Sequence, residues 1–92
     1  TKTPLYTGQP ITAKIGMKEG LEGGEKFEVL EQLMNPETGS IEYKKKGTIT
    51  VNKKFIWDNR YNGSEVLDTE VKATTFKGGK NYYSGMLIRQ LK

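Results

Sequence analysis

The chain has 92 residues, the size of one small domain. It contains no Cys and no His, so disulfides, zinc sites built from these residues, Cys nucleophiles and catalytic triads with an imidazole base are excluded. The net charge of +4 is unevenly distributed, because residues 1–43 hold 4 basic and 7 acidic residues whereas residues 44–92 hold 11 basic and 4 acidic residues.

The start of the sequence predicts an extended segment followed by one strand. Residues 1–9 are interpreted as an N-terminal arm or linker, with little order expected at its beginning. Ile11, Ala13 and Ile15 alternate with polar residues, which is the period of a strand with one buried face. Residues 16–24 are rich in Gly, and we predict a turn-rich connector there.

Two longer strands follow, joined by a turn. Lys26–Met34 and Ile41–Val51 carry apolar residues at alternate positions. The residues between them include 35–39 (NPETG), in which Pro presets the backbone and Gly can take a left-handed conformation. This pattern predicts a β-hairpin.

The pairing of this hairpin can also be predicted. If Met34 faces Ser40 across the turn, then Glu28 faces Lys46 in the neighbouring strand. Such an opposite-charge pair contributes about 0.2–1 kcal/mol. We expect a bulge beside Gly47, because the inward alternation breaks just before it.

The second half of the chain is more irregular. Residues 55–57 (FIW) form a short apolar stretch, and residues 58–63 are polar and turn-like. Residues 64–69 are compatible with one helical turn, with Ser64 as its N-cap.

A strand is then predicted at residues 70–77. Its inward positions are Val71, Ala73 and Thr75, or Phe76 if the register shifts. Residues 78–85 begin with a Gly-rich turn. A last strand is predicted at Met86–Leu91.

Five or six short strands joined by tight turns predict an all-β, mainly antiparallel fold. We expect a small SH3-like or OB-like barrel with at most one short helical turn, formed by residues 10–92. A two-sheet sandwich is the alternative, but it usually needs about seven strands. Because the chain does not begin with Met, we expect this domain to be one module of a longer protein.

No group of residues predicts catalysis or metal binding. Glu19, Glu22 and Glu25 lie three residues apart in the Gly-rich connector, but they lack the aspartate pattern of a calcium loop. Residues 78–80 (GGK) lack the full phosphate-loop pattern. We therefore predict no enzyme activity, no catalytic residues, no metal and no cofactor.

The most distinctive stretch is residues 57–61 (WDNRY). It places two aromatic rings, an acid and one of the two Arg residues of the chain within five positions. Exposed aromatic rings can stack on a ligand or pack against a partner. The candidate binding residues are Trp57, Asp58, Arg60, Tyr61, Tyr82 and Tyr83.

A structural role is the alternative for the same residues. Trp57 would then plug the end of the barrel, while Asp58 and Arg60 would hold the loop in place. Of Tyr82 and Tyr83, one is expected to pack and the other to lie outside, as alternation along an extended chain requires.

The basic second half of the chain permits a second interpretation, namely a nucleic-acid-binding barrel with exposed aromatic residues. However, 13 of the 15 cationic residues are Lys. Phosphate recognition favours Arg, so a solvated basic face is the simpler interpretation.

Two stretches carry a resemblance to a known group of proteins. They are residues 15–29 (IGMKEGLEGGEKFEV) and residues 78–89 (GGKNYYSGMLIR). Together they resemble the C-terminal SH3-like barrel of uncharacterised Gram-negative cell-envelope proteins. Comparable modules occur in the curli-secretion lipoprotein family and in the flagellar T-ring protein. The resemblance implies a non-catalytic binding or assembly module, located in the periplasm or at the outer membrane, whose partner is another protein or envelope component.

Overall fold

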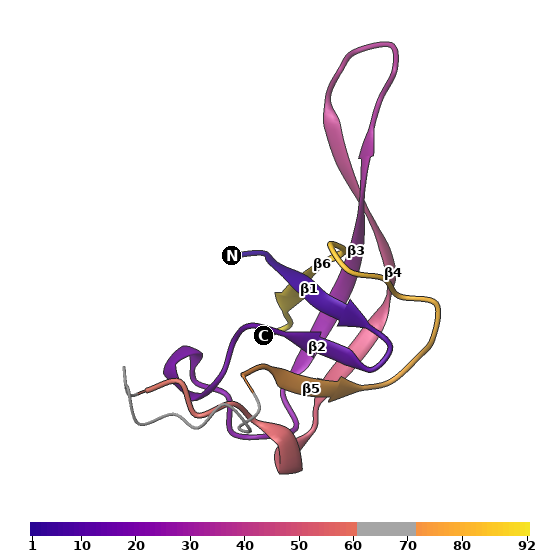
Figure 1. Ribbon diagram of the computed structural model, residues 1–92. Helices are drawn as coiled ribbons and strands as arrows, with labels where there is room; N and C mark the ends of the chain where they lie inside the picture. The colour runs from indigo at the N-terminus through magenta and orange to yellow at the C-terminus, as the bar shows by residue number, and fades with distance from the viewer. Residues whose placement is uncertain (61–71) are drawn as a thin grey trace.

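Six antiparallel strands close into one ring in the computed structural model, which describes residues 1–60 and 72–92 (Figure 1). The order around the ring is β1-β2-β5-β4-β3-β6. This arrangement confirms the prediction of a small, mainly antiparallel β-barrel. The strands are β1 Thr3–Gly8, β2 Ile11–Ala13, β3 Lys26–Met34, β4 Ile41–Val51, β5 Thr74–Lys77 and β6 Leu87–Gln90.

The core fills the inside of this ring with alternate residues of the strands. Phe27 and Phe76 meet edge to face, with ring centroids 5.3 Å apart. Ile49 and Ile88 are completely buried around them. The rest of the core cluster is Leu5, Ile11, Ala13, Ile15, Leu21, Val29, Val51 and Met86.

The prediction that residues 1–9 form an N-terminal linker is wrong for Thr3–Gly8, which form strand β1 of the barrel wall. β1 pairs with β2 on one side and with β6 on the other. Leu5 is buried and is the only aliphatic core residue that the strand contributes. The strand therefore owes its order to its neighbours, and its own sequence shows no apolar alternation.

The bounds of the long hairpin are as predicted, but its register is not. Met34 pairs with Ile41, one position further than expected, and Lys46 is left out of the ladder between Val29 and Leu30 of β3. The bulge therefore lies beside Gly47, as predicted. The predicted Glu28–Lys46 pair is wrong. Glu28 instead accepts a hydrogen bond from Arg89 Nη2 on β6 over 3.2 Å.

Helical structure in the described residues is limited to two short 3-10 turns. They span Met17–Glu19 (η1), in the predicted turn-rich connector, and Lys53–Phe55 (η2), directly after β4. The helical turn predicted at residues 64–69 lies outside the described residues, as does the predicted start of the strand at 70–77. No helix in the two described ranges is long and apolar enough to cross a membrane.

The inward-facing residues of β5 and β6 are visible from their burial. Thr74 and Phe76 of β5 are buried, so the shifted register through Phe76 is the one observed. In β6 only Ile88 is fully buried, with Met86 buried just before it.

The hairpin of β3 and β4 extends far beyond the ring, at the top of Figure 1. β6 pairs with β3 only as far as Leu30, and β5 pairs with β4 only at Thr50 and Val51. The molecule is consequently elongated, measuring 51 × 25 × 24 Å. We call residues 31–45, which form the projecting part of this hairpin, the arm.

Candidate binding surfaces

Backbone contacts position the predicted Trp57–Arg60 loop beside η1. Trp57 forms a parallel bridge with Gly16, and its carbonyl accepts a hydrogen bond from the Met17 N–H over 2.9 Å. Its own N–H donates to the buried Thr74 hydroxyl over 3.1 Å. The loop is therefore attached to β5 on one side and to η1 on the other.

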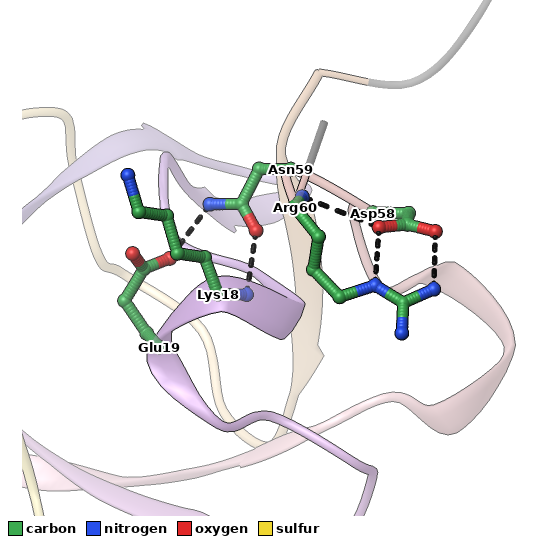
Figure 2. A network of polar contacts seen from close by, with 5 residues as sticks. All are labelled: Lys18, Glu19, Asp58, Asn59 and Arg60. Carbon is green, nitrogen blue, oxygen red and sulfur yellow. Dashed lines mark hydrogen bonds and ion pairs between the residues drawn. The ribbon is translucent and has the colours of Figure 1, made fainter. Parts of the chain in front are cut away.

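Asn59 holds this loop against η1 with both ends of its side-chain amide (Figure 2). Its Nδ2 donates to Glu19 Oε1 over 2.7 Å, and its Oδ1 accepts from the Lys18 N–H over 2.7 Å. The same Glu19 oxygen accepts from the Gly16 N–H. Asn59 was not among the predicted site residues, because its partners lie 40 and 41 residues away along the chain.

Asp58 and Arg60 pair with each other at the outside of the loop (Figure 2). Arg60 Nε and Nη2 each donate to one carboxylate oxygen of Asp58 over 2.9 Å. These bonds hold the pKa of the Asp58 carboxyl below its ordinary value. The two bonds use the Nε–Nη2 edge of the Arg60 guanidinium, and the side chains of Arg60 and Asp58 are both about half exposed.

The Trp57 ring is partly exposed and does not belong to the core cluster. Its neighbour Ile56 packs against the core instead, so the alternative in which Trp57 plugs the end of the barrel is not observed. Lys14 Nζ lies 5.9 Å from the Trp57 ring and 4.3 Å from the exposed Tyr6 ring. Tyr6 was not predicted, because residues 1–9 were assigned to a linker.

Tyr82 and Tyr83 divide as predicted, one packed and one exposed. Tyr82 packs against the core, and its hydroxyl lies so close to Gly47 that an added Cβ there would come within 2.0 Å of it. Tyr83 is exposed and donates its hydroxyl to Glu31 Oε2 over 2.7 Å. This bond raises the pKa of the Tyr83 phenol above its ordinary value.

The candidate residues from the sequence do not form one surface. The Trp57–Arg60 loop lies next to η1, whereas Tyr83 lies at the base of the arm, bonded to Glu31. Figure 1 shows these two segments at different ends of the ring. Tyr61 lies outside the described residues.

The acidic connector proves to be a turn held by its own carboxylates. Glu25 accepts hydrogen bonds from the N–H groups of Glu22 and Gly23, both over 2.8 Å. Partial burial raises the pKa of Glu25, but these backbone bonds outweigh it, and the net pKa is lowered. Among the described residues, no group of three or more acidic side chains is arranged to hold a metal ion.

The arm presents a surface that the sequence analysis did not select. Met34 pairs with Ile41, and Gln32 pairs with Tyr43, so these four side chains share one face. The exposed fractions of Met34, Ile41 and Tyr43 are 67%, 43% and 45%. We call this the apolar face of the arm.

The other face of the arm is predominantly charged. Leu33 pairs with Glu42, and Glu31 pairs with Lys44. The apolar face carries positive charge only near its base, where Lys45 pairs with Leu30 and Lys2 Nζ lies 4.4 Å from the Tyr43 ring centroid. The two faces of the arm are thus chemically distinct.

Comparison of the chain with protein families, with curated proteins and with solved structures finds no match. The resemblance of residues 15–29 and 78–89 to cell-envelope modules therefore stays a prediction from the sequence.

Proposed function

We propose that this domain is a non-catalytic binding and assembly module of a bacterial cell-envelope protein, and that the apolar face of the arm contacts its partner. One observation carries the proposal. Met34, Ile41 and Tyr43 lie together on a hairpin that projects beyond the barrel, where nothing in the described residues buries them. Contiguous exposed apolar side chains of this kind mark interaction sites.

The non-catalytic part of the proposal follows from residue types and from the use of the carboxylates. The chain has neither Cys nor His. Glu19, Glu25 and Asp58 are engaged in hydrogen bonds that shape turns and loops. The envelope location and the SH3-like variant of the barrel rest on the resemblance of the sequence alone.

Site-specific photocrosslinking tests the proposed contact surface. A photoreactive residue replaces Met34 on the arm or Phe55 in η2, which is 49% exposed at the other end of the barrel. In cells that express the full chain, Met34 is expected to give discrete adducts that Ile41→Glu removes. Equal adducts from both positions, or none from Met34, would overturn the proposal. Cell fractionation of the same strain tests the envelope location.

A nucleic-acid-binding barrel is the second candidate, favoured by the grouping of Tyr6, Lys14 and Trp57. The Lys14 ammonium lies between two aromatic rings that are at least partly exposed. Exposed rings with adjacent cations are the elements of a single-strand stacking surface. Titration with a single-stranded oligonucleotide at low salt tests it, because the electrostatic contribution is largest there. The absence of binding under that condition excludes this candidate.

A further inference from the structure

The outer edge of β4 has no neighbouring strand along the arm in the part of the chain that the structure describes. β5 pairs with β4 only at Thr50 and Val51. The loop that carries Tyr82 comes close to β4 at Gly47, beyond the base of the arm. Residues 41–45 therefore present an open backbone edge, which is a template for the addition of another strand.

The turn fixes which backbone groups point toward this open edge. The Asn35 N–H donates to the Ser40 carbonyl over 2.8 Å, and the Asn35 carbonyl accepts from the Gly39 N–H, so the backbone groups of Asn35 and the Ser40 carbonyl point inward between the two strands. Hydrogen-bonded and non-hydrogen-bonded pairs alternate along an antiparallel ladder. Ile41, Tyr43 and Lys45 consequently direct their N–H and C=O groups away from β3 and toward the open edge.

Charge along the arm is distributed in a way that suits a second arm. Glu37 lies in the turn and Glu42 beside it, while Lys44 and Lys45 lie nearer the barrel, followed by the bulged Lys46. Lysine residues on an exposed edge normally oppose strand addition. Two antiparallel arms, however, bring the acidic tip of each beside the basic base of the other.

We propose that the open edge of β4 pairs with the same edge of a second copy of this chain, antiparallel about a two-fold axis at Tyr43. Tyr43 then faces the partner's Tyr43, and Glu42 faces the partner's Lys44. Two opposite-charge pairs form, one on each side of the axis, on the charged face of the arm. The two hairpins become one four-stranded sheet, with both apolar faces on the same side.

The charges select this register over its neighbours. An axis centred on Glu42 places the two Glu42 carboxylates opposite each other, and an axis centred on Lys44 does the same with two ammonium groups. Like charges directly opposite each other are destabilising. The axis at Tyr43 also keeps Tyr43 and the other outward-facing residues in hydrogen-bonding positions, because Ile41 then faces the partner's Lys45.

This inference goes beyond the proposed function, because the second copy pairs with the edge of β4 and leaves both apolar faces exposed. A charge-reversal experiment tests it. The variants Glu42→Lys and Lys44→Glu each convert the two attractive pairs into two repulsive ones. Mixed together, they restore two attractive pairs, because Lys at position 42 of one chain then faces Glu at position 44 of the other. Lys46→Glu is the matched control, because it changes the net charge as Lys44→Glu does but alters neither pair.

Sedimentation velocity over a concentration series of the 92-residue chain provides the measurement. We expect a monomer–dimer equilibrium that each single reversal weakens by roughly tenfold or more, that the equimolar mixture restores, and that Lys46→Glu leaves within about threefold. A monomer at every concentration, no restoration in the mixture, or an equal effect of Lys46→Glu would overturn the proposal. The proposed function fails separately, if Met34 gives no specific crosslink to any protein.

Discussion

β3 and β4 run through two different environments within one hairpin. In the barrel, Phe27 and Val29 of β3 face Ile49 and Gly47 of β4, and the three apolar side chains are at most 5% exposed. In the arm, Met34 and its neighbours are paired by the same kind of ladder but are mostly exposed. The sequence alternates apolar residues in both parts.

The difference shows that strand pairing and burial have separate causes. In the barrel, the remaining strands close the ring and cover the hairpin. In the arm, none of the described residues adds a further strand, and an isolated two-stranded ribbon is only marginally stable in water. The arm is held at its tip by the bonds of Asn35 and Ser40, and at its base by Tyr83 and Lys2. Its apolar side chains therefore lie outside the barrel core and contribute little to it.

Matched truncations on β4 give the largest predicted contrast. Ile49→Ala removes a completely buried side chain and should lower the free energy of unfolding by about 2–5 kcal/mol. Ile41→Ala removes a side chain that is 43% exposed and should change it by about 0.5 kcal/mol or less at concentrations where the chain is monomeric. Urea denaturation provides the measurement. Equal losses would show that the arm belongs to the cooperative core.

A pair of threonine substitutions sharpens the comparison for polar groups. The buried Thr74 hydroxyl donates to the Ile15 carbonyl and accepts from the Trp57 N–H. Thr74→Val leaves both backbone groups without this partner and should destabilise the domain by about 1–3 kcal/mol. Thr38→Val in the exposed turn should cost about 0.5 kcal/mol or less, because water can replace its bonds to Ser40. Thermal unfolding distinguishes the two, and a larger effect at Thr38 would contradict the separation of barrel and arm.

The acidic turn before β3 should make the barrel end sensitive to low pH. The pKa of Glu25 is lowered in the folded state. The carboxylate therefore contributes fully to the free energy of unfolding at pH values above its usual pKa of 4.5, and this contribution is lost as the pH falls through the lowered pKa of the folded state. Glu25→Gln should cost about 0.5–1 kcal/mol at neutral pH, a modest amount because this carboxylate is only partly buried and solvent screens it.

The test of this prediction is denaturant unfolding of both proteins from neutral to acidic pH. The difference in stability between the wild type and Glu25→Gln should shrink on acidification. Glu37→Gln at the exposed tip of the arm controls for the loss of one negative charge away from this turn. A difference that stays constant down to low pH would show that the Glu25 carboxylate does not act through its charge.

The strands of the hairpin could be predicted because their signals are local. Apolar alternation and the NPETG turn are contained within residues 26–51, and the bounds of β3 and β4 follow from them. The register could not be predicted correctly. The Asn35–Ser40 hydrogen bond shifts the pairing by one position from the expected register, and the bulge at Lys46 shifts it by one more. β1 was missed because its order comes from pairing with β2 and β6, whereas its own sequence shows no apolar alternation.

The candidate surfaces were harder to predict than the fold. Met34, Ile41 and Tyr43 have the alternation of a core strand. They lie outside the barrel because β6 and β5 stop pairing with β3 and β4 before the hairpin reaches these residues. Asn59 had no local signal, since its partners lie on η1. Local sequence therefore identified the strands other than β1, whereas closure of the ring determined which of their side chains are exposed.

The smallest predicted effect concerns the junction between the two regions. Tyr83, in the loop before β6, donates to Glu31 at the base of the arm, and the pKa of its phenol is raised above the usual 10.0. The bond therefore contributes fully to the free energy of unfolding at pH values below the usual pKa. This contribution is lost as the pH rises through the raised pKa of the folded state. Spectrophotometric titration should show one tyrosine that ionises late in the wild type. That late ionisation should disappear in Tyr83→Phe and move back toward the usual value in Glu31→Gln. If Glu31→Gln leaves it unchanged, the Tyr83 bond does not persist in solution, and Lys2 over Tyr43 becomes the contact that orients the arm on the barrel.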